Sequence, residues 1–363
     1  DAPSAKPSAA TLKDTTMHRP SRSLRALRPT LERLEDRRLL VVTGLGLAGD
    51  SLTDEYFDAS YDYALNWVSL VGQERAAEVP LGELKLSPDS WGEPRRQGYE
   101  YNWARSGASS ATLLSQSQHT SVAQDLTDGD ISHAVLAIGQ NDFFPTPGSA
   151  YHNIYNGLWN QTQIDNYTAA VLANIETAAD TILAADAQIV MSNIIDYGVA
   201  PYTASAGYTN AAQRQLVTDV IADLNADIAA YAATNRVPLV DAFSFAADLL
   251  STPSFSFGGV SINNSGGTSP TNAFVHDTIH PHTVASSLLA NAFLYAMNEG
   301  HHENIPLFTE QEVLDLVGLT YVSDTFAFDY ADYLIWVPQT TGLFSHDPGT
   351  SDGYTLFSPN TSN

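Results

Sequence analysis

The sequence contains no cysteine among its 363 residues. Disulfides, thiol nucleophiles and cysteine-ligated zinc sites are therefore excluded, and covalent catalysis would need an oxygen or a lysine nucleophile. Positive charge is also scarce, with 16 basic against 41 acidic side chains and a net charge of −25. Because this charge repels phosphate backbones and anionic headgroups, we expect neither a nucleic-acid partner nor polybasic membrane attachment.

Long apolar runs are missing as well. The longest, residues 39–48, is interrupted by threonine and glycine and falls well short of the roughly 18 apolar residues that suggest a membrane-spanning helix. We therefore predict no transmembrane segment. The overall hydrophobic content of 44% is nevertheless high enough for a folded, globular chain rather than a disordered one.

Charge is unevenly distributed along the chain. Residues 1–40 carry nine basic and five acidic side chains and are rich in Pro, Ser and Ala, whereas the other 323 residues hold 7 bases against 36 acids. Residues 1–40, here called the head, also lack the apolar periodicity of a core-forming segment. We predict a disordered basic leader or tether over 1–40, a main domain over 41–300 and a C-terminal extension over 301–363.

The end of the head carries a second signal. Residues 34–40, Leu-Glu-Asp-Arg-Arg-Leu-Leu, resemble the N-terminal sorting signal that precedes many bacterial exported and surface proteins. This resemblance implies a secreted or cell-surface location. Conventional signal cleavage after residues 39–48 would remove the first predicted strand, so we do not expect cleavage there.

From residue 41 onward, short β-rich runs alternate with amphipathic helical segments, the pattern of an α/β fold with a parallel sheet covered on both faces. The predicted strands are 41–48, one ending near Arg105, and 134–138, 188–193 and 238–240. The predicted helices are 63–74, 163–184, 210–233 and 283–297. The composition of residues 261–270 indicates a polar loop.

The C-terminal extension has its own pattern. Thr309 and Glu312 form a capping box that predicts a short helix ending at Gly318, and the aromatic, acid-rich residues 326–336 predict an edge strand or hairpin. We expect this extension to pack on the main domain. A substrate-side lid and an anchoring tail are the alternatives.

Four short blocks carry the chemistry. They are Gly49-Asp-Ser51, Asn102-Trp-Ala-Arg-Ser-Gly107, Gly139-Gln-Asn-Asp142 and Asp277-Thr-Ile-His280-Pro281. Each follows the end of a predicted strand or opens the last helix, where open α/β sheets place their ligands. A single Gly-Asp-Ser motif is weak evidence for a catalytic serine, because any strand-to-helix turn favours these residues. The four blocks in this order are more specific evidence.

Together, the blocks closely resemble those of the GDSL, or SGNH, hydrolase family of esterases and lipases, over residues 44 to about 297. The resemblance implies a flavodoxin-like α/β/α sandwich with strand order 2-1-3-4-5 and no cofactor. It also implies that Ser51 is the nucleophile, with Asp277 and His280 completing the triad. Ser51, Gly107 and Asn141 are then the oxyanion-hole donors.

Physical chemistry favours the same roles. A serine hydroxyl needs an imidazole to accept its proton and a carboxylate to hold that imidazole in the correct tautomer. The three-residue spacing of Asp277 and His280 lets both side chains lie on one face of a tight loop. The backbone N–H of Gly107 is unobstructed by a Cβ, and Asn141 offers a side-chain N–H, so both suit a tetrahedral oxyanion.

Two other motifs compete for the site. Residues 276–282, His-Asp-Thr-Ile-His-Pro-His, could bind a transition metal, although the spacing matches no common zinc pattern. If they do not, we interpret His276 and His282 as loop residues near the site. Gly349-Thr-Ser351-Asp-Gly353 fits the nucleophile elbow of α/β-hydrolases, but no histidine follows Ser351, so we expect it to be accidental.

The sequence therefore predicts a serine hydrolase that cleaves carboxylic esters through an acyl-enzyme. We expect a short-acyl esterase or a carbohydrate deacetylase acting on a small-molecule or polysaccharide ester, because no long apolar, lid-like segment is present. A lipase or long-chain esterase, and a surface binding module that retains the motif without turnover, are the alternatives.

Overall fold

The structure, a computed structural model, describes residues 42–58 and 60–336. By its contacts the chain divides into residues 1–39 and 40–363, and everything below concerns the second unit. None of the helices in the described ranges is long and apolar enough to cross a membrane.

A five-stranded sheet forms the centre of the fold, with the order β1-β4-β5-β6-β10. Neighbouring strands run parallel from β1 to β6, as predicted, while β10 adds an antiparallel edge beside β6. Parallel pairing brings the carboxyl ends of β1 and β4 to one edge, since Gly49 pairs with Ala137. The strands are β1 (Leu45–Gly49), β4 (His133–Ala137), β5 (Gln188–Ser192), β6 (Leu239–Val240) and β10 (Leu334–Ile335).

The predicted second strand is much shorter than expected. On the outer side of β1 the chain forms only an isolated parallel bridge, between Leu47 and Asn102. Leu47 donates to the Tyr101 carbonyl, and Trp103 donates to the Leu47 carbonyl. The segment occupies the predicted place in the strand order, but it pairs with β1 too briefly to form a regular strand there. The short hairpin of β2 (Leu84–Lys85) and β3 (Gly98–Tyr99) precedes it.

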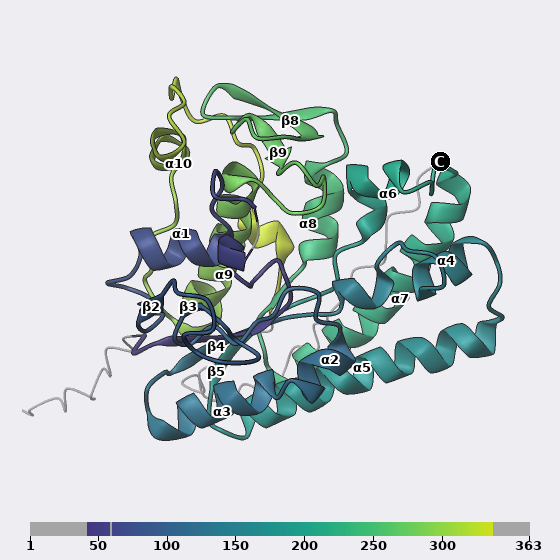
Figure 1. Ribbon diagram of the computed structural model, residues 1–363, viewed down its shortest axis with the longest axis horizontal. Coiled ribbons are helices and arrows are strands. Elements are labelled where there is room, and N and C mark those ends of the chain that lie inside the picture. The colour runs from purple at the N-terminus through teal and green to yellow at the C-terminus, as the bar shows by residue number, and fades with distance from the viewer. Residues whose placement is uncertain (1–41, 59, 337–363) are drawn as a thin grey trace, which may run out of the picture. The chain divides into compact units, whose positions relative to one another are not determined.

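Helices cover both faces of the sheet, which gives the predicted three layers. Helices α3 and α5 lie on one side of β4 and β5, with α1 and α9 on the other (Figure 1). The helices are α1 (Trp67–Glu74), α2 (Ser110–Ser115), α3 (Gln118–Asp128), α4 (Ala150–Tyr155), α5 (Gln161–Leu183), α6 (Pro201–Ser205), α7 (Ala211–Asn235), α8 (Ala242–Leu249), α9 (Thr283–His301) and α10 (Glu310–Leu316).

Successive side chains of each central strand pack into two separate hydrophobic cores. In β4, Val135 packs with the core under α1 and α9, whereas Ala134 and Leu136 pack with the core under α3, α5 and α7. This follows from the two-residue period of a strand, which points successive side chains to opposite faces. Strands covered on both faces therefore read as continuous apolar runs, which is why the sequence revealed them.

The predicted polar loop at residues 261–270 is wrong for most of its length. Residues Val260–Gly266 form β8, which pairs with β7 (Ser254–Phe257) and β9 (Asn272–Phe274) in a small second sheet. Only Ile262 is buried in β8, so the strand lacks an apolar pattern. Its pairing with β7, which carries the buried Phe255 and Phe257, outweighs the turn-like composition.

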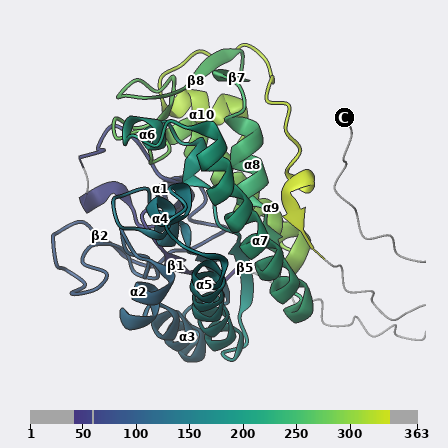
Figure 2. The ribbon, with the colours of Figure 1, turned by 90° about the vertical axis from the view of Figure 1, so that its right-hand side faces the viewer.

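The C-terminal segment is held by the side chains of two glutamates. Arg75, the C-cap residue of α1, forms a bidentate pair with Glu312 of α10, at 2.6 and 2.8 Å. Glu310 accepts backbone N–H bonds from Gly258, in the β7–β8 turn, and from Thr325, so β7, β8 and α10 lie together (Figure 2). The capping box of Thr309 and Glu312 is present.

Candidate active site

The nucleophile turn begins where β1 ends. A Cβ on Gly49 would lie 2.6 Å from the carbonyl oxygen of Ala137, so only glycine lets the two strands approach here. The carboxylate of Asp50 then accepts the N–H of Leu52 at 3.0 Å, which closes the turn. Ser51 is placed at its tip and is 9% exposed.

Asp277 and His280 lie in the loop between β9 and α9. One Asp277 oxygen, Oδ1, accepts the backbone N–H groups of Ile279 and His280 at 2.9 and 3.0 Å. The other, Oδ2, contacts Nδ1 of His280 directly. Burial opposes the charge of Asp277, but the hydrogen bond and charge of His280, together with Tyr61, hold the pKa of this carboxyl well below its usual range. Asp277 therefore stays ionised and can orient the imidazole.

Tyr61 is a further partner that the sequence analysis missed. Its hydroxyl donates to Oδ2 of Asp277 at 2.6 Å, and its ring lies 5.7 Å from that of His280. Burial first, and then the hydrogen bond to Asp277, raise the pKa of Tyr61. The phenol therefore remains a donor throughout the ordinary pH range. No spacing signal in the sequence ties Tyr61 to a residue more than two hundred positions away.

Ser51 and His280 line the same two cavities, and His280 is the only histidine among the described residues that line either of them. Within residues 42–58 and 60–336 the Ser51 hydroxyl makes no hydrogen bond to the imidazole, and catalytic hydrogen bonds are often long before substrate binds. Because Nδ1 of His280 faces Asp277, Nε2 is the ring nitrogen left to accept the proton of Ser51.

The two predicted oxyanion donors reach the same cavity as Ser51. Gly107 has φ of +78°, a left-handed conformation that favours glycine. Asn141 donates one N–H to the carbonyl of Ala108 at 3.0 Å and accepts the hydroxyl of Tyr197 at 3.1 Å. Since an amide nitrogen carries two hydrogens, one remains for an oxyanion, and Tyr197 fixes which end of the amide is the donor.

Two buried aspartates position the oxyanion segments, and the sequence analysis assigned neither. Asp54 accepts the N–H of Ser106 at 2.7 Å and an N–H of Arg105 at 3.1 Å, next to Gly107. Asp142 accepts both the N–H and the hydroxyl of Ser110, at 2.8 and 3.0 Å. The available signal was their position in the sequence, because Asp54 follows Ser51 by three residues and Asp142 ends the third motif block, one residue after Asn141.

Other buried acids surround the nucleophile turn. Burial raises the pKa of Asp50 to about 7, although the N–H of Leu52 and the charge of His280 act in the opposite direction. Burial also raises the pKa of Glu55 to about 8, with the neighbouring Asp54 adding to the rise. The site is therefore less negative near neutral pH than its count of carboxyl groups indicates.

The rival metal cluster is not assembled around one point. The Nδ1 atom of His276 contacts the hydroxyl of Tyr63 at 2.8 Å, and that of His282 accepts the N–H of Thr283 at 2.8 Å, capping α9. Across the described ranges no group of three or more His, Asp and Glu side chains is placed to hold a metal ion. His282 is buried and is the N-cap residue of α9. Ser351 lies outside the described residues.

The geometry supports one kind of chemistry. A hydroxyl, an imidazole and an ionised carboxylate lie at one edge of a parallel sheet, beside N–H donors suited to a tetrahedral oxyanion. This is the arrangement of acyl transfer to serine.

Comparison with solved structures finds distant likenesses. One is the esterase EstA from Pseudoalteromonas sp., with 14% identity, a TM-score of 0.39, and coverage of 72% of this chain and 100% of that one. An acetyl xylan esterase, AlAXEase, has 13% identity and a TM-score of 0.41, covering 69% and 98%. A variant of Axe2, an acetyl-xylooligosaccharide esterase from Geobacillus, has 16% identity and a TM-score of 0.38, covering 70% and 93%. At such low identity and TM-score these likenesses do not bear on the activity.

No curated protein matches the sequence. The model of one protein family, GDSL-like lipase/acylhydrolase, matches residues 45–293, which include all four motif blocks and exclude the head and the C-terminal segment. The chain belongs to this GDSL-like lipase/acylhydrolase family and is a carboxylic ester hydrolase.

Proposed function

We propose that the protein hydrolyses esters of short acyl groups, including acetyl groups on carbohydrates, through an acyl-enzyme on Ser51. The observation that carries the proposal is the shared cavity in which Ser51 and His280 meet Gly107 and Asn141, with Asp277 bonded to the far side of the imidazole.

The reaction proceeds in two balanced halves. His280 takes the proton of Ser51 as its oxygen attacks the ester carbonyl, and the N–H groups of Ser51, Gly107 and Asn141 stabilise the oxyanion. The intermediate collapses, the alcohol leaves with the proton from His280, and the acyl group remains on Ser51. Water then attacks the acyl-enzyme and loses its proton to His280. His280 passes this proton to the Ser51 oxygen as the bond to the acyl group breaks, which releases the carboxylic acid and free Ser51.

The surroundings of Ser51 support a small acyl group and a bulky, polar alcohol. One cavity, of about 100 Å³, is lined by Asp54, Tyr61 and Ser106 among others. The wider cavity, of about 370 Å³, includes the aromatic side chains of Phe144 and Tyr197 in its lining. An open cavity with aromatic faces suits a sugar, whose apolar ring face packs against such side chains.

The long-chain alternative has less support. A lipase needs an apolar surface beside its nucleophile that is long enough for a whole fatty acyl chain. In the described chain the large exposed apolar side chains, such as Leu86, Leu158 and Val322, are separate, and none lines either cavity at Ser51. Single exposed apolar residues are normal on soluble surfaces.

An activity screen tests the proposal. Hydrolysis of p-nitrophenyl esters from acetate to dodecanoate is measured beside release of acetate from acetylated xylan. We expect turnover of the short esters, and a loss of about 10⁴- to 10⁶-fold in kcat for Ser51→Ala and for His280→Ala, because the two residues act as one unit.

Ser351→Ala is the matched control, since Ser351 sits in the other serine motif of the chain. It should retain full activity. An active, folded Ser51→Ala variant together with an inactive Ser351→Ala variant would overturn the assignment, and a preference for dodecanoate over acetate would overturn the substrate class.

A further inference from the structure

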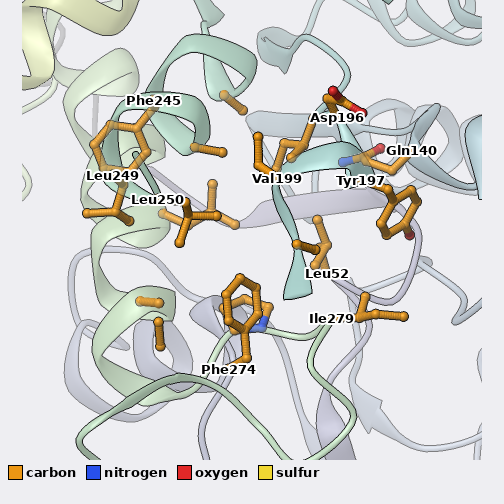
Figure 3. A pocket seen from close by; sticks show the side chains of 18 residues that line it. Leu52, Gln140, Asp196, Tyr197, Val199, Phe245, Leu249, Leu250, Phe274 and Ile279 are labelled. Carbon is orange, nitrogen blue, oxygen red and sulfur yellow. The ribbon is translucent and has the colours of Figure 1, made fainter. Parts of the chain in front are cut away.

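A third cavity lies beside the catalytic residues. It has a volume of about 100 Å³ and is lined by the nucleophile turn, Gln140 after β4, the loop after β5, helix α8 with the residue after it, and the segment from β9 into α9 (Figure 3). Phe245, Leu249 and Leu250 form one side, and Leu52, Ile279 and Tyr197 lie on the other. The hydrolysis described above does not require this space.

Three residues that line this cavity are direct sequence neighbours of residues in the catalytic site. Leu52 follows Ser51, Gln140 precedes Asn141, and Ile279 precedes His280, and all three of these neighbours line the apolar cavity. Tyr197 and Ile279 also line the open cavity that contains Ser51 and the oxyanion donors. These two side chains are therefore the common wall between the reacting atoms and the apolar space.

The lining excludes most polar ligands. Besides the phenol of Tyr197, its polar side chains are those of Gln140 and Asp196. The carboxylate of Asp196 already accepts the N–H of Gly198 and the hydroxyl of Thr218, both at 2.6 Å. The remaining lining is aliphatic or aromatic, so a hydrocarbon segment is the ligand chemistry it fits.

We propose that this cavity binds the acyl chain of the substrate, which passes between Tyr197 and Ile279 when the carbonyl carbon sits at Ser51. The inference rests on the proposed function and adds the limit on chain length. An apolar cavity of about 150 Å³ holds benzene, so a space of about 100 Å³ accepts a chain of roughly four carbons beyond the carbonyl. Acetyl groups do not reach it.

The structure thus assigns a chain-length profile. Each methylene group that enters the cavity raises kcat/KM by about fourfold, so the profile rises from acetate to an optimum between butanoate and hexanoate. Longer chains cannot be accommodated, and kcat/KM falls again by decanoate. A bulky side chain that fills the cavity would abolish the increase in kcat/KM with chain length and leave kcat/KM for acetate nearly unchanged.

Ala246→Phe tests this directly, because Ala246 lines the cavity from α8. We expect kcat/KM for hexanoate to fall at least tenfold relative to acetate, with acetate within twofold of the wild type. Ala247→Phe is the matched control, since Ala247 lies on the same helix and is not part of the lining. It should leave the ratio unchanged. Thermal unfolding checks that both variants are folded.

If Ala246→Phe does not fold, Leu249→Ala enlarges the same cavity from α8 and should move the optimum to chains about two carbons longer. Leu224→Ala, which removes a buried leucine from the other core, should leave the optimum unchanged. Equal losses for all ester lengths, or an unaltered profile in both cavity variants, would overturn the inference.

A series of alkyl acetates separates the acyl side from the alcohol side. A change confined to that series would place the alcohol in the cavity and overturn the inference. Failure of the proposed function is distinguishable, because the wild type would then not hydrolyse even acetate esters through Ser51.

Discussion

The hydroxyl of Tyr61 donates to the same oxygen of Asp277 that contacts Nδ1 of His280, at a distance of 2.6 Å. Asp277 is thus held from three directions, since its second oxygen accepts two backbone N–H groups. The orienting carboxylate is fixed before substrate arrives, which leaves the imidazole little freedom to rotate away from Ser51.

Tyr61→Phe should lower kcat by about threefold to tenfold, roughly 1 kcal/mol, with little change in KM. The loss is modest because the hydrogen bond exists both before and during the reaction, so that only its strengthening in the transition state counts. The acidic limb of the pH profile of kcat/KM should also move to higher pH. A carboxylate with one hydrogen bond fewer holds a positively charged imidazole more strongly.

Tyr63→Phe is the control for this variant, because the Tyr63 hydroxyl contacts His276 and not Asp277. It should keep the wild-type kcat and pH profile. If Tyr61→Phe and Tyr63→Phe gave the same small loss and the same profile, the role of Tyr61 in holding Asp277 would be wrong.

Asn141→Ala should lower kcat by about 10²- to 10³-fold, because one donor to the oxyanion is lost. Tyr197→Phe should cost only severalfold. It removes the hydroxyl that fixes the orientation of the Asn141 amide, but the bond from Asn141 to Ala108 remains. Steady-state kinetics on p-nitrophenyl acetate measure both. A larger loss for Tyr197→Phe than for Asn141→Ala would contradict this order.

Glu55→Gln should stabilise the fold increasingly as pH rises. The pKa of Glu55 in the folded protein is about 8, whereas an unperturbed glutamate titrates near 4.3. Between these values the folded state binds more protons than the unfolded chain, so the free energy of unfolding contributed by Glu55 falls as pH rises through this window. Glutamine keeps an oxygen to accept the N–H of Tyr99 and has no charge to bury.

Chemical unfolding at pH 4, 7 and 9 checks this prediction. The free energy of unfolding of the variant should match that of the wild type at pH 4 and exceed it by about 2 kcal/mol at pH 9, a figure reduced from the full shift because local relaxation lowers the cost of burying a charge. A difference between variant and wild type that stays constant with pH would show that Glu55 is not protonated in the folded protein at neutral pH.

Deletion of residues 1–38 should leave ester hydrolysis and Tm nearly unchanged. This head is basic and has no apolar periodicity, and the described fold begins at Val42, which is buried. Kinetics and thermal unfolding of the truncated chain provide the measurement. A large loss of either quantity would mean that the head packs on the main domain.

The sequence predicted those parts of the fold that depend on local patterns of apolar residues. Strands covered on both faces are apolar throughout, and helices such as α5 and α7 bury one face at three- and four-residue spacing. Two of the four motif blocks follow β1 and β4, and the parallel pairing of these strands places Ser51 and Asn141 at one edge of the sheet. The sequence could therefore predict that these two residues lie close together, whereas Gly107 and His280 were assigned from their motifs.

The parts that were missed depend on contacts between distant segments. Strand β8 has the composition of a loop and is set by its partners, and the second strand is reduced to one bridge. Tyr61 reaches Asp277 across the fold, and the apolar cavity takes residues from five separate segments. These contacts join residues that are far apart in the sequence and follow no helical or strand periodicity. A local sequence pattern therefore does not predict them.

Active-site labelling tests the central claim most directly. The protein is incubated with a fluorophosphonate, and the adduct is located by mass spectrometry of its peptides while residual hydrolysis is followed. The account predicts one phosphonyl group per chain on Ser51, loss of activity in proportion to labelling, and no adduct in Ser51→Ala. Complete inactivation with the adduct on another residue, or full hydrolysis by a chain labelled at Ser51, would contradict it.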